Sequence, residues 1–252
     1  MATGDVVVDV SQDWALACNV QQRFMQSLGR RRGSVDSSAR CRQLHALGGD
    51  CYDFMPLTKE RLALLVGDAS GKGLAAALMI ASVQSSLRTA ALFTRNDLAA
   101  LLQVVNHQAY TSSPTDRYAT LFYSIVDAET RTLRYVNAGH NPPLVFRRNG
   151  SFEWLEKGGA PVGMFPDSCY EESVVQLDPG DLVIAYTDGI MEAANPSGNE
   201  WGVQGLVQAT TEWAQQYAGD ADDLVHFIFK SMDEYSGGCQ TDDATLAVVR
   251  IS

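Results

Sequence analysis

Apolar residues are distributed along the chain in two kinds of segment, which divide it into predicted helices and strands. Longer segments rich in apolar and helix-forming residues predict helices over residues 13–28, 74–92, 96–110, 203–217 and 221–235, with Asn96 as a candidate cap of the third. Short runs rich in β-branched and aromatic residues, bounded by turn formers, predict strands over residues 62–66, 120–126, 133–137, 144–146, 174–177, 182–186 and 245–251.

The order of these elements indicates the class of fold. Consecutive strands joined by short turns imply antiparallel pairing. Helices and strands that are grouped rather than alternating favour an α+β layered fold over a doubly wound parallel sheet. Residues 29–38 contain three arginines, two glycines and three serines without an apolar period, which predicts a flexible connector. We therefore expect a lead-in helix and connector over residues 1–38 and one domain over residues 39–252.

Composition narrows the class of protein further. The chain has 252 residues, 46% of them hydrophobic, and a formal charge of -11, which disfavours a nucleic-acid-binding surface. Its five cysteines are widely spaced without a CxxC pair, so we expect neither a disulfide framework nor a zinc site, and a cytoplasmic location fits. The longest wholly apolar run, residues 74–81, is too short to cross a bilayer. We expect no membrane attachment through this chain itself.

The chemistry is indicated by aspartates that lie near the ends of predicted strands, usually beside glycine or a second acid. A neighbouring glycine lets the backbone turn, so that a short carboxylate and a backbone carbonyl can face one point. Hard divalent cations such as Mg²⁺ and Mn²⁺ prefer oxygen-rich shells of this kind. One Asp-Gly pair is usually an ordinary turn, whereas several indicate either turns or a shared metal site. The aspartates concerned are Asp50, Asp53, Asp68, Asp188, Asp242 and Asp243.

Residues 67–73 (GDASGKG) invite comparison with the phosphate-binding loop of nucleotide-binding proteins. A Walker A loop has four residues between its first glycine and the Gly-Lys pair, and then serine or threonine. Here there are three, and Gly73 follows Lys72, so the nucleotide-binding interpretation fails. What remains is a helix N-terminus near Gly73, where the helix dipole favours an anion. Lys72 either attracts an anionic substrate or simply begins that helix.

Six motifs, taken in order, resemble those of a known family. They are GGDCYD at residues 48–53, VGDASGKG at 66–73 with AAAL at 75–78, YVNAGHNPPL at 135–144, GAPVG at 159–163, YTDGIMEA at 186–193 and DDATL at 242–246. Over roughly residues 40–252 they resemble the bacterial SpoIIE/RsbU-type members of the PPM family of metal-dependent serine/threonine protein phosphatases. The helix predicted at residues 13–28 is similar to the lead-in helix that these domains carry after an upstream sensory module.

This resemblance implies a fold, a cofactor and a site. The fold is an α-β-β-α sandwich of two mainly antiparallel sheets flanked by helices, with two divalent cations, Mn²⁺ or Mg²⁺, at one end. Asp68 matches the carboxylate that bridges the cations, and with Asp188 and Asp242 it forms the expected catalytic set. The expected metal ligands are Asp50, Asp68, the carbonyl of Ala69, Asp188, Asp242 and, ranked below Asp242, Asp243.

The implied reaction is hydrolysis of phosphoserine or phosphothreonine in a protein by a hydroxide that bridges the two cations. Some relatives have a histidine as general acid two positions after the bridging aspartate; here that position is Ser70, and a water on the metal is the simplest substitute. Arg40 and Arg42 are the candidates for holding the phosphate. His140 is expected to shape a turn, and Asp53 either supports the ligands or lies on a surface turn.

The same resemblance implies partners. The expected substrate is a phosphorylated anti-sigma-factor antagonist of the STAS type. The lead-in helix can form a homodimer contact and connect to an upstream sensory domain. The helices after Asp68 can be misplaced until a regulator positions them, which would leave one metal site incomplete.

The residues disfavour two alternatives to an active phosphatase. One is a catalytically silent or autoinhibited binding module, which the filled acidic positions disfavour. The other is a different binuclear metal hydrolase such as a nuclease, which the charge of -11 and the phosphatase motifs disfavour. No nucleic-acid partner is expected.

Overall fold

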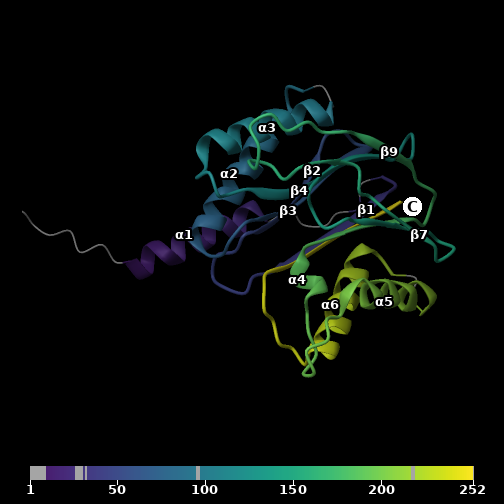
Figure 1. Ribbon diagram of the computed structural model, residues 1–252. Helices are drawn as coiled ribbons and strands as arrows, with labels where there is room; N and C mark the ends of the chain where they lie inside the picture. Colours follow the sequence, from purple (N-terminus) through teal and green to yellow (C-terminus); the bar gives the residue numbers. More distant parts are fainter. Residues whose placement is uncertain (1–9, 26–30, 32, 95–96, 217–218, 252) are drawn as a thin grey trace, which may run out of the picture.

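Two β-sheets pack face to face, and helices cover the outer face of each sheet (Figure 1). The computed structural model describes residues 10–25, 31, 33–94, 97–216 and 219–251. The first sheet contains, in spatial order, β1 (Val35–Arg42), β11 (Ala244–Ile251), β10 (Leu182–Tyr186), β6 (Leu144–Phe146) and β7 (Phe152–Trp154). The second contains β2 (Asp50–Pro56), β3 (Arg61–Ala69), β4 (Ala119–Asp127), β5 (Thr132–Ala138) and β8 (Gly158–Gly159), with β9 (Ser173–Gln176) paired to β5.

The helices form the two outer layers of this sandwich (Figure 1). The second sheet is covered by α2 (Leu74–Ala91) and α3 (Leu98–Ser112), and the first by α5 (Gly202–Gln216) and α6 (Ala221–Ser236). A single turn, α4 (Asp188–Met191), follows β10. Among the described strands every pairing is antiparallel except that of β5 with β8. The predicted α-β-β-α sandwich is therefore confirmed.

The central strands have apolar residues on both faces because each sheet is covered on both sides. In β3, Leu64 and Val66 point into the core between the sheets, whereas Ala63 and Leu65 pack beneath α2 and α3. The same alternation in β11 separates residues that face the other sheet from residues that face α5 and α6. This double burial explains why these two segments are uninterrupted apolar runs in the sequence.

The helix α2 follows the loop after β3, the strand that carries Asp68. It is, in the described part of the chain, the one helix long and apolar enough to cross a bilayer. Its buried side chains pack on β2, β3 and α3, as in the core helix of a globular domain. The next helix, α3, is capped by Asp97, whose carboxylate accepts a hydrogen bond from Ala100 N at 2.9 Å. The predicted cap, Asn96, lies outside the described residues.

Four strands, β1, β2 and the short β7 and β8, lie where the apolar pattern predicted none. Residues 35–38, expected to belong to the flexible connector, form the start of β1, which pairs with β11 along its whole length. That part of the connector prediction is wrong, because Ser37 and Ser38 are buried polar side chains in an edge strand and Ser38 Oγ is satisfied by Asp222 at 2.6 Å. The strand β2 was missed because two buried acids interrupt its apolar residues.

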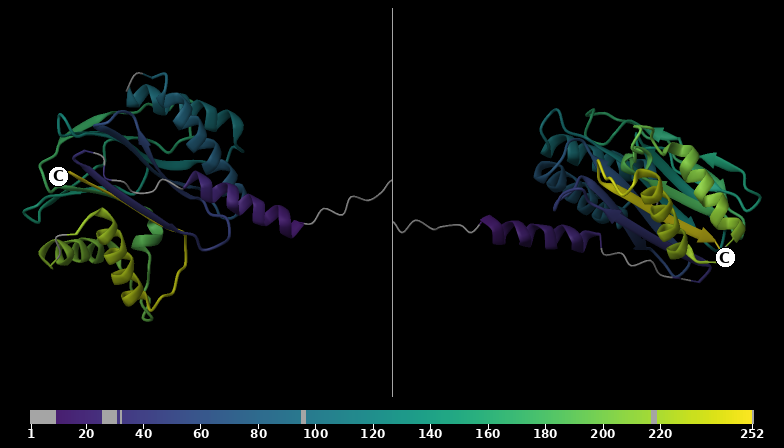
Figure 2. Two further views of the ribbon diagram at one scale, coloured as in Figure 1. Left: turned by 180° about the vertical axis from the view of Figure 1, so that it is seen from behind. Right: turned by 90° about the horizontal axis from the view of Figure 1, so that it is seen from below.

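The helix α1 (Val10–Phe24) begins before the predicted lead-in helix of residues 13–28, overlaps it up to Phe24 and projects from the side of the sandwich (Figure 2). Its side chains are mostly exposed, including Trp14, Leu16 and Val20. Gln21 and the following Met25 are buried against the domain. The remainder of the predicted helix, residues 26–28, lies outside the described residues.

Candidate functional site

The strand pairing brings the predicted acids to one end of the sandwich. Asp50 and Asp68 are direct partners on β2 and β3. Asp188 follows β10, and Asp242 and Asp243 precede β11, which is the neighbour of β10. A Cβ at Gly189 would overlap the carbonyl of Asp243, so the two late motifs are in contact. Four segments distant in the sequence therefore meet at this end, which we call the acidic edge (Asp50, Asp68, Asp188, Asp242 and Asp243).

Asp50 joins the two sheets at this edge. Its Oδ2 accepts hydrogen bonds from the hydroxyls of Thr187 and Thr245, both at 2.7 Å; Thr245 lies on β11 of the other sheet, and Thr187 directly follows β10 of that sheet. Burial, and next the charge of Asp68, raise the pKa of Asp50 well above its usual range. A carboxylate so placed favours a nearby cation, which would offset the cost of its ionisation.

Asp68 and Asp188 also resist ionisation. Burial, followed by the charges of Asp188 and Asp242, raises the pKa of Asp68 to about 7. The pKa of Asp188 is raised by burial and then by the charge of Asp242. These acids are close enough to repel one another, and such mutual repulsion is relieved when hard divalent cations bind between carboxylates.

Lys72 provides one positive charge at the acidic edge. Its Nζ lies 2.5 Å from Oδ2 of Asp242, and this hydrogen bond is the main cause of the raised pKa of Lys72. The lysine side chain is 56% exposed and comes from the loop before α2, so it can leave without disturbing the core. The ammonium thus occupies one side of a carboxylate that the resemblance assigns to a metal ion.

Asp243 differs from its neighbour, because its carboxylate is bound by backbone amides. Leu44 N donates to Oδ1 at 2.7 Å, and Gly49 N donates to Oδ2 at 2.9 Å. A Cβ at Gly48 would overlap this carboxylate, which accounts for a glycine at that position. Asp243 therefore holds the segment before β2 in place, and its assignment as a metal ligand stays a prediction.

The donor set of the acidic edge suits Mg²⁺ or Mn²⁺. Its donor atoms are oxygens, from the carboxylates and from the backbone carbonyl of Ala69. This carbonyl lies against Gly49, where an added Cβ atom would come within 3.1 Å of it. Among the described residues, no three carboxylate, imidazole or thiol groups converge closely enough to hold one ion in the present arrangement. Release of Lys72 from Asp242 is the smallest change that frees a ligand here.

The two arginines predicted to hold phosphate lie against α6. The guanidinium groups of Arg40 and Arg42 lie 5.1 and 4.9 Å from the ring centroid of Phe229. Arg42 also makes a bidentate ion pair with Asp233, at 2.6 and 2.9 Å. Arg117, which no motif indicated, lies nearer the acids, where its Nη1 donates to the carbonyl of Ser70 at 2.9 Å. The assignment of Arg40 and Arg42 stays a prediction.

Asp53 and His140 are both structural in this arrangement. Asp53 is fully buried and pairs with Arg88 of α2 at 2.5 and 2.7 Å, so its interpretation as a surface acid is wrong. His140 is buried, which lowers its pKa to about 4, and its Nδ1 lies 2.9 Å from Thr120 Oγ1. Its backbone N–H donates to Asn137 at 2.7 Å, in agreement with the turn expected there.

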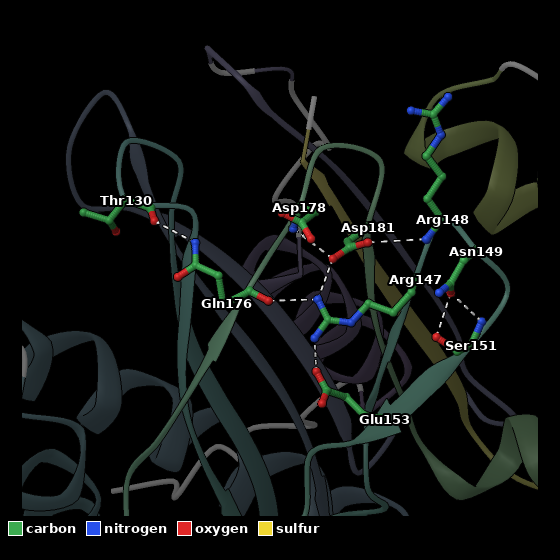
Figure 3. A network of polar contacts seen from close by, with 9 residues as sticks. All are labelled: Thr130, Arg147, Arg148, Asn149, Ser151, Glu153, Gln176, Asp178 and Asp181. Atoms are coloured by element: carbon green, nitrogen blue, oxygen red, sulfur yellow. Dashed lines mark hydrogen bonds and ion pairs between the residues drawn. The ribbon is translucent and has the colours of Figure 1, made fainter.

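At the opposite end of β10, charged and polar side chains form a network of hydrogen bonds and ion pairs (Figure 3). Arg147 donates to buried Asp181 at 2.6 Å and to the carbonyl of Gln176 at 2.8 Å, and it also pairs with Glu153. Asp178 N donates to the same Asp181 carboxylate at 2.9 Å. Acids at this end have an arginine partner, whereas the acidic edge has an excess of negative charge.

The two-sheet sandwich with helices on both outer faces is the PP2C-type fold, which is represented among solved structures. The SiaA-PP2C domain of Pseudomonas aeruginosa matches 96% of this chain and 97% of its own with a TM-score of 0.81 and 20% identity. RsbX in complex with magnesium matches 89% of this chain and 98% of its own with a TM-score of 0.66 and 16% identity. At these identities the likeness shows the fold alone.

Sequence comparison identifies the family. The family model for Stage II sporulation protein E (SpoIIE) matches residues 58–252, and the chain belongs to this family. Protein IcfG of Synechocystis sp. is 28% identical over 230 residues, which are 81% of this chain and 36% of IcfG. Phosphoserine phosphatase RsbU of Bacillus subtilis is 25% identical over 248 residues, or 96% of this chain and 71% of RsbU. The chain thus spans about a third of IcfG and most of RsbU.

Proposed function

We propose that this chain is a metal-dependent protein phosphatase that hydrolyses phosphoserine or phosphothreonine in a protein. The observation that carries the proposal is the meeting of Asp68, Asp188 and Asp242 at one edge, where burial and the neighbouring negative charges raise the pKa of Asp68 and of Asp188. Membership of the SpoIIE family supports it, as does the similarity to RsbU, which is named a phosphoserine phosphatase.

The cofactors in this proposal are two divalent cations, Mn²⁺ or Mg²⁺. Asp68 would lie between them, with the Ala69 carbonyl beside it and Asp50, Asp188 and Asp242 completing the protein ligands. When bound, such cations activate water and offset the charge on phosphoryl oxygens. The structure of RsbX with magnesium supports this choice of ion for the fold.

The chain's own residues would orient the phosphoprotein. Two cationic groups near the acidic edge suit a phosphate dianion: Lys72, once released from Asp242, and Arg117, which is bonded to the carbonyl of Ser70, two residues after Asp68. Ser70 uses its hydroxyl to accept a hydrogen bond from Tyr118 N at 3.0 Å. This bond places Ser70 in the loop after β3, and, following the resemblance, we assign the proton for the leaving alkoxide to water at the site.

The proposed substrate is a phosphorylated anti-sigma-factor antagonist of the STAS type, following the resemblance to RsbU. An upstream sensory domain and a homodimer through α1 complete the proposal, since the chain spans only part of its relatives and α1 exposes Trp14, Leu16 and Val20. We also place the chain in the cytoplasm, which is supported by five free cysteines.

The second candidate is an autoinhibited or catalytically silent binding module. It is favoured by one observation: among the described residues no three ligand groups converge on one point as they stand. The two candidates differ in whether an added cation restores turnover.

The test is hydrolysis of p-nitrophenyl phosphate and of a phosphoserine peptide with Mn²⁺, Mg²⁺ or EDTA. We expect cation-dependent turnover that is abolished by EDTA and falls by about 100-fold or more in Asp68→Asn, since a bridging ligand is lost. Asp178→Asn, at the opposite end of β10, is the matched control and should retain activity. Turnover that persists in EDTA would refute the metal mechanism, and no turnover with any cation would favour the binding module.

A further inference from the structure

The helix α1 touches the domain through one buried polar side chain. From Ser11 to Phe24, Gln21 alone is buried, with 7% of its surface exposed. Its Nε2 donates to the carbonyl of Gly48 at 2.7 Å, and its Oε1 accepts from Gly48 N at 3.2 Å. Gln43 donates to the same Oε1 at 2.9 Å. A buried amide is costly unless it is bonded, so these contacts define one position for the helix.

Gly48 is held between this glutamine and the acidic edge. A Cβ at Gly48 would overlap the Asp243 carboxylate, so the backbone lies directly against it. The next residue, Gly49, donates to Asp243 at 2.9 Å and accepts from Ala69 N at 3.0 Å. Asp50 follows in the chain. A displacement of Gly48 therefore reaches both the first acid and the carbonyl beside Asp68.

A second contact fixes the end of α1 one turn later. Gln84 of α2 donates to the carbonyl of Phe24 at 3.0 Å and to buried Asp53 at 3.2 Å. At Phe24 the helix α1 is thus bonded to Gln84 of α2, which also binds Asp53 of β2. At Gln21 it is bonded to Gly48, in the segment before β2. These two connections are independent of each other, and only the one at Gln21 leads to Gly48.

We propose that Gln21 is a positioning residue, which transmits the placement of α1 to the acidic edge through the backbone of Gly48 and Gly49. The proposal rests on the proposed function only in taking this edge as the active site. Withdrawal of the Gln21 amide frees Gly48, and the ligand oxygens of Asp50 and Ala69 then lose their alignment.

The test compares Gln21→Met with Gln22→Met. Methionine keeps the length and apolar burial of the side chain but removes both bonds to Gly48, and Gln22 is the exposed neighbour on the same helix. For Gln21→Met we expect faster amide hydrogen exchange at residues 48–50, Mn²⁺ affinity about 10-fold weaker by calorimetry, and a loss in kcat that exceeds the change in KM. Gln22→Met should match the wild type in all three measurements.

Two results would overturn the proposal. One is a Gln21→Met protein with a lower Tm but unchanged exchange and Mn²⁺ affinity, which would make Gln21 a purely stabilising residue. The other is an equal effect of Gln22→Met. If Gln21→Met does not fold, Gln43→Met leaves both bonds of Gln21 to Gly48 in place and removes only the bond from Gln43, so it should show a smaller effect of the same sign. Exchange is measured without catalysis, so an inactive wild-type protein would refute the proposed function and leave this inference testable.

Discussion

Asp68 is a carboxylate whose surroundings oppose its charge. Burial and two neighbouring aspartates raise its pKa to about 7, whereas in the unfolded chain it returns to about 3.8. Between these values the native protein binds more protons than the unfolded chain, so the stability of the metal-free protein falls as pH rises through this window. Above about pH 7 the full cost of the charge remains.

Asparagine at position 68 should therefore stabilise the metal-free protein. We expect the Tm of Asp68→Asn in EDTA to exceed that of the wild type by about 3 °C or more at pH 8, at roughly 2–4 °C per kcal/mol for a chain of this size. The difference should shrink as the pH is lowered towards 5. Thermal unfolding across this pH range measures it, and a variant less stable than the wild type at pH 8 would contradict the account.

Individual residues at the site differed in how far the sequence could predict them. The acids lie in motifs and were named in advance, but Gln21 and Arg117 belong to no motif and have no periodic signal. Their roles depend on contacts with backbone carbonyls distant in sequence, those of Gly48 and Ser70. Asp53 could not be assigned either, because its partner Arg88 comes from another element.

Among the elements, α2 and β2 are joined by the ion pair of Arg88 and Asp53. The Asp53 side chain is fully buried and that of Arg88 is 48% exposed. Removal of the arginine leaves an unpaired buried charge, which is more costly than the loss of the pair itself. We expect Arg88→Met to lower the free energy of unfolding by about 2–3 kcal/mol, allowing for the exposure of the arginine.

Chemical denaturation measures this loss, and two variants control it. Arg148→Met removes an exposed arginine elsewhere and should have little effect. The double variant Asp53→Asn, Arg88→Met removes the buried charge as well, so it should be more stable than Arg88→Met. A double variant less stable than the single one would show that the cost does not arise from the unpaired carboxylate.

Strands with apolar residues on both faces could be predicted from the sequence. Strands that bury polar side chains could not be recognised from the apolar pattern. The strands β3 and β11 pack on both sides, and their apolar runs identified them. The strand β1 has serines that are satisfied by other elements, and β2 contains Asp50 and Asp53, so neither shows the usual pattern. Local patterns therefore revealed the layers of the sandwich but missed the two strands next to the site.

At the scale of the whole molecule, α1 projects from the domain and exposes large apolar side chains. Leu16 and Val20, four residues apart on one helix face, are 61% and 55% exposed. If α1 forms a homodimer contact, Leu16→Ser with Val20→Ser should shift the protein towards monomer in sedimentation experiments. Phe152→Ser, at an exposed aromatic of β7, is the control. A wild type that is monomeric at high concentration would exclude this dimer for the isolated chain.

The ion pair of Lys72 with Asp242 has a further consequence for the molecule as a whole. Because an ammonium already occupies one face of that carboxylate, uptake of a cation there is an exchange of one charge for another rather than an addition. The apparent affinity of the cation is lowered by the free energy of the ion pair that it replaces. When the cation dissociates, Lys72 can pair with Asp242 again. The chain thereby carries its own exchangeable counterion for Asp242.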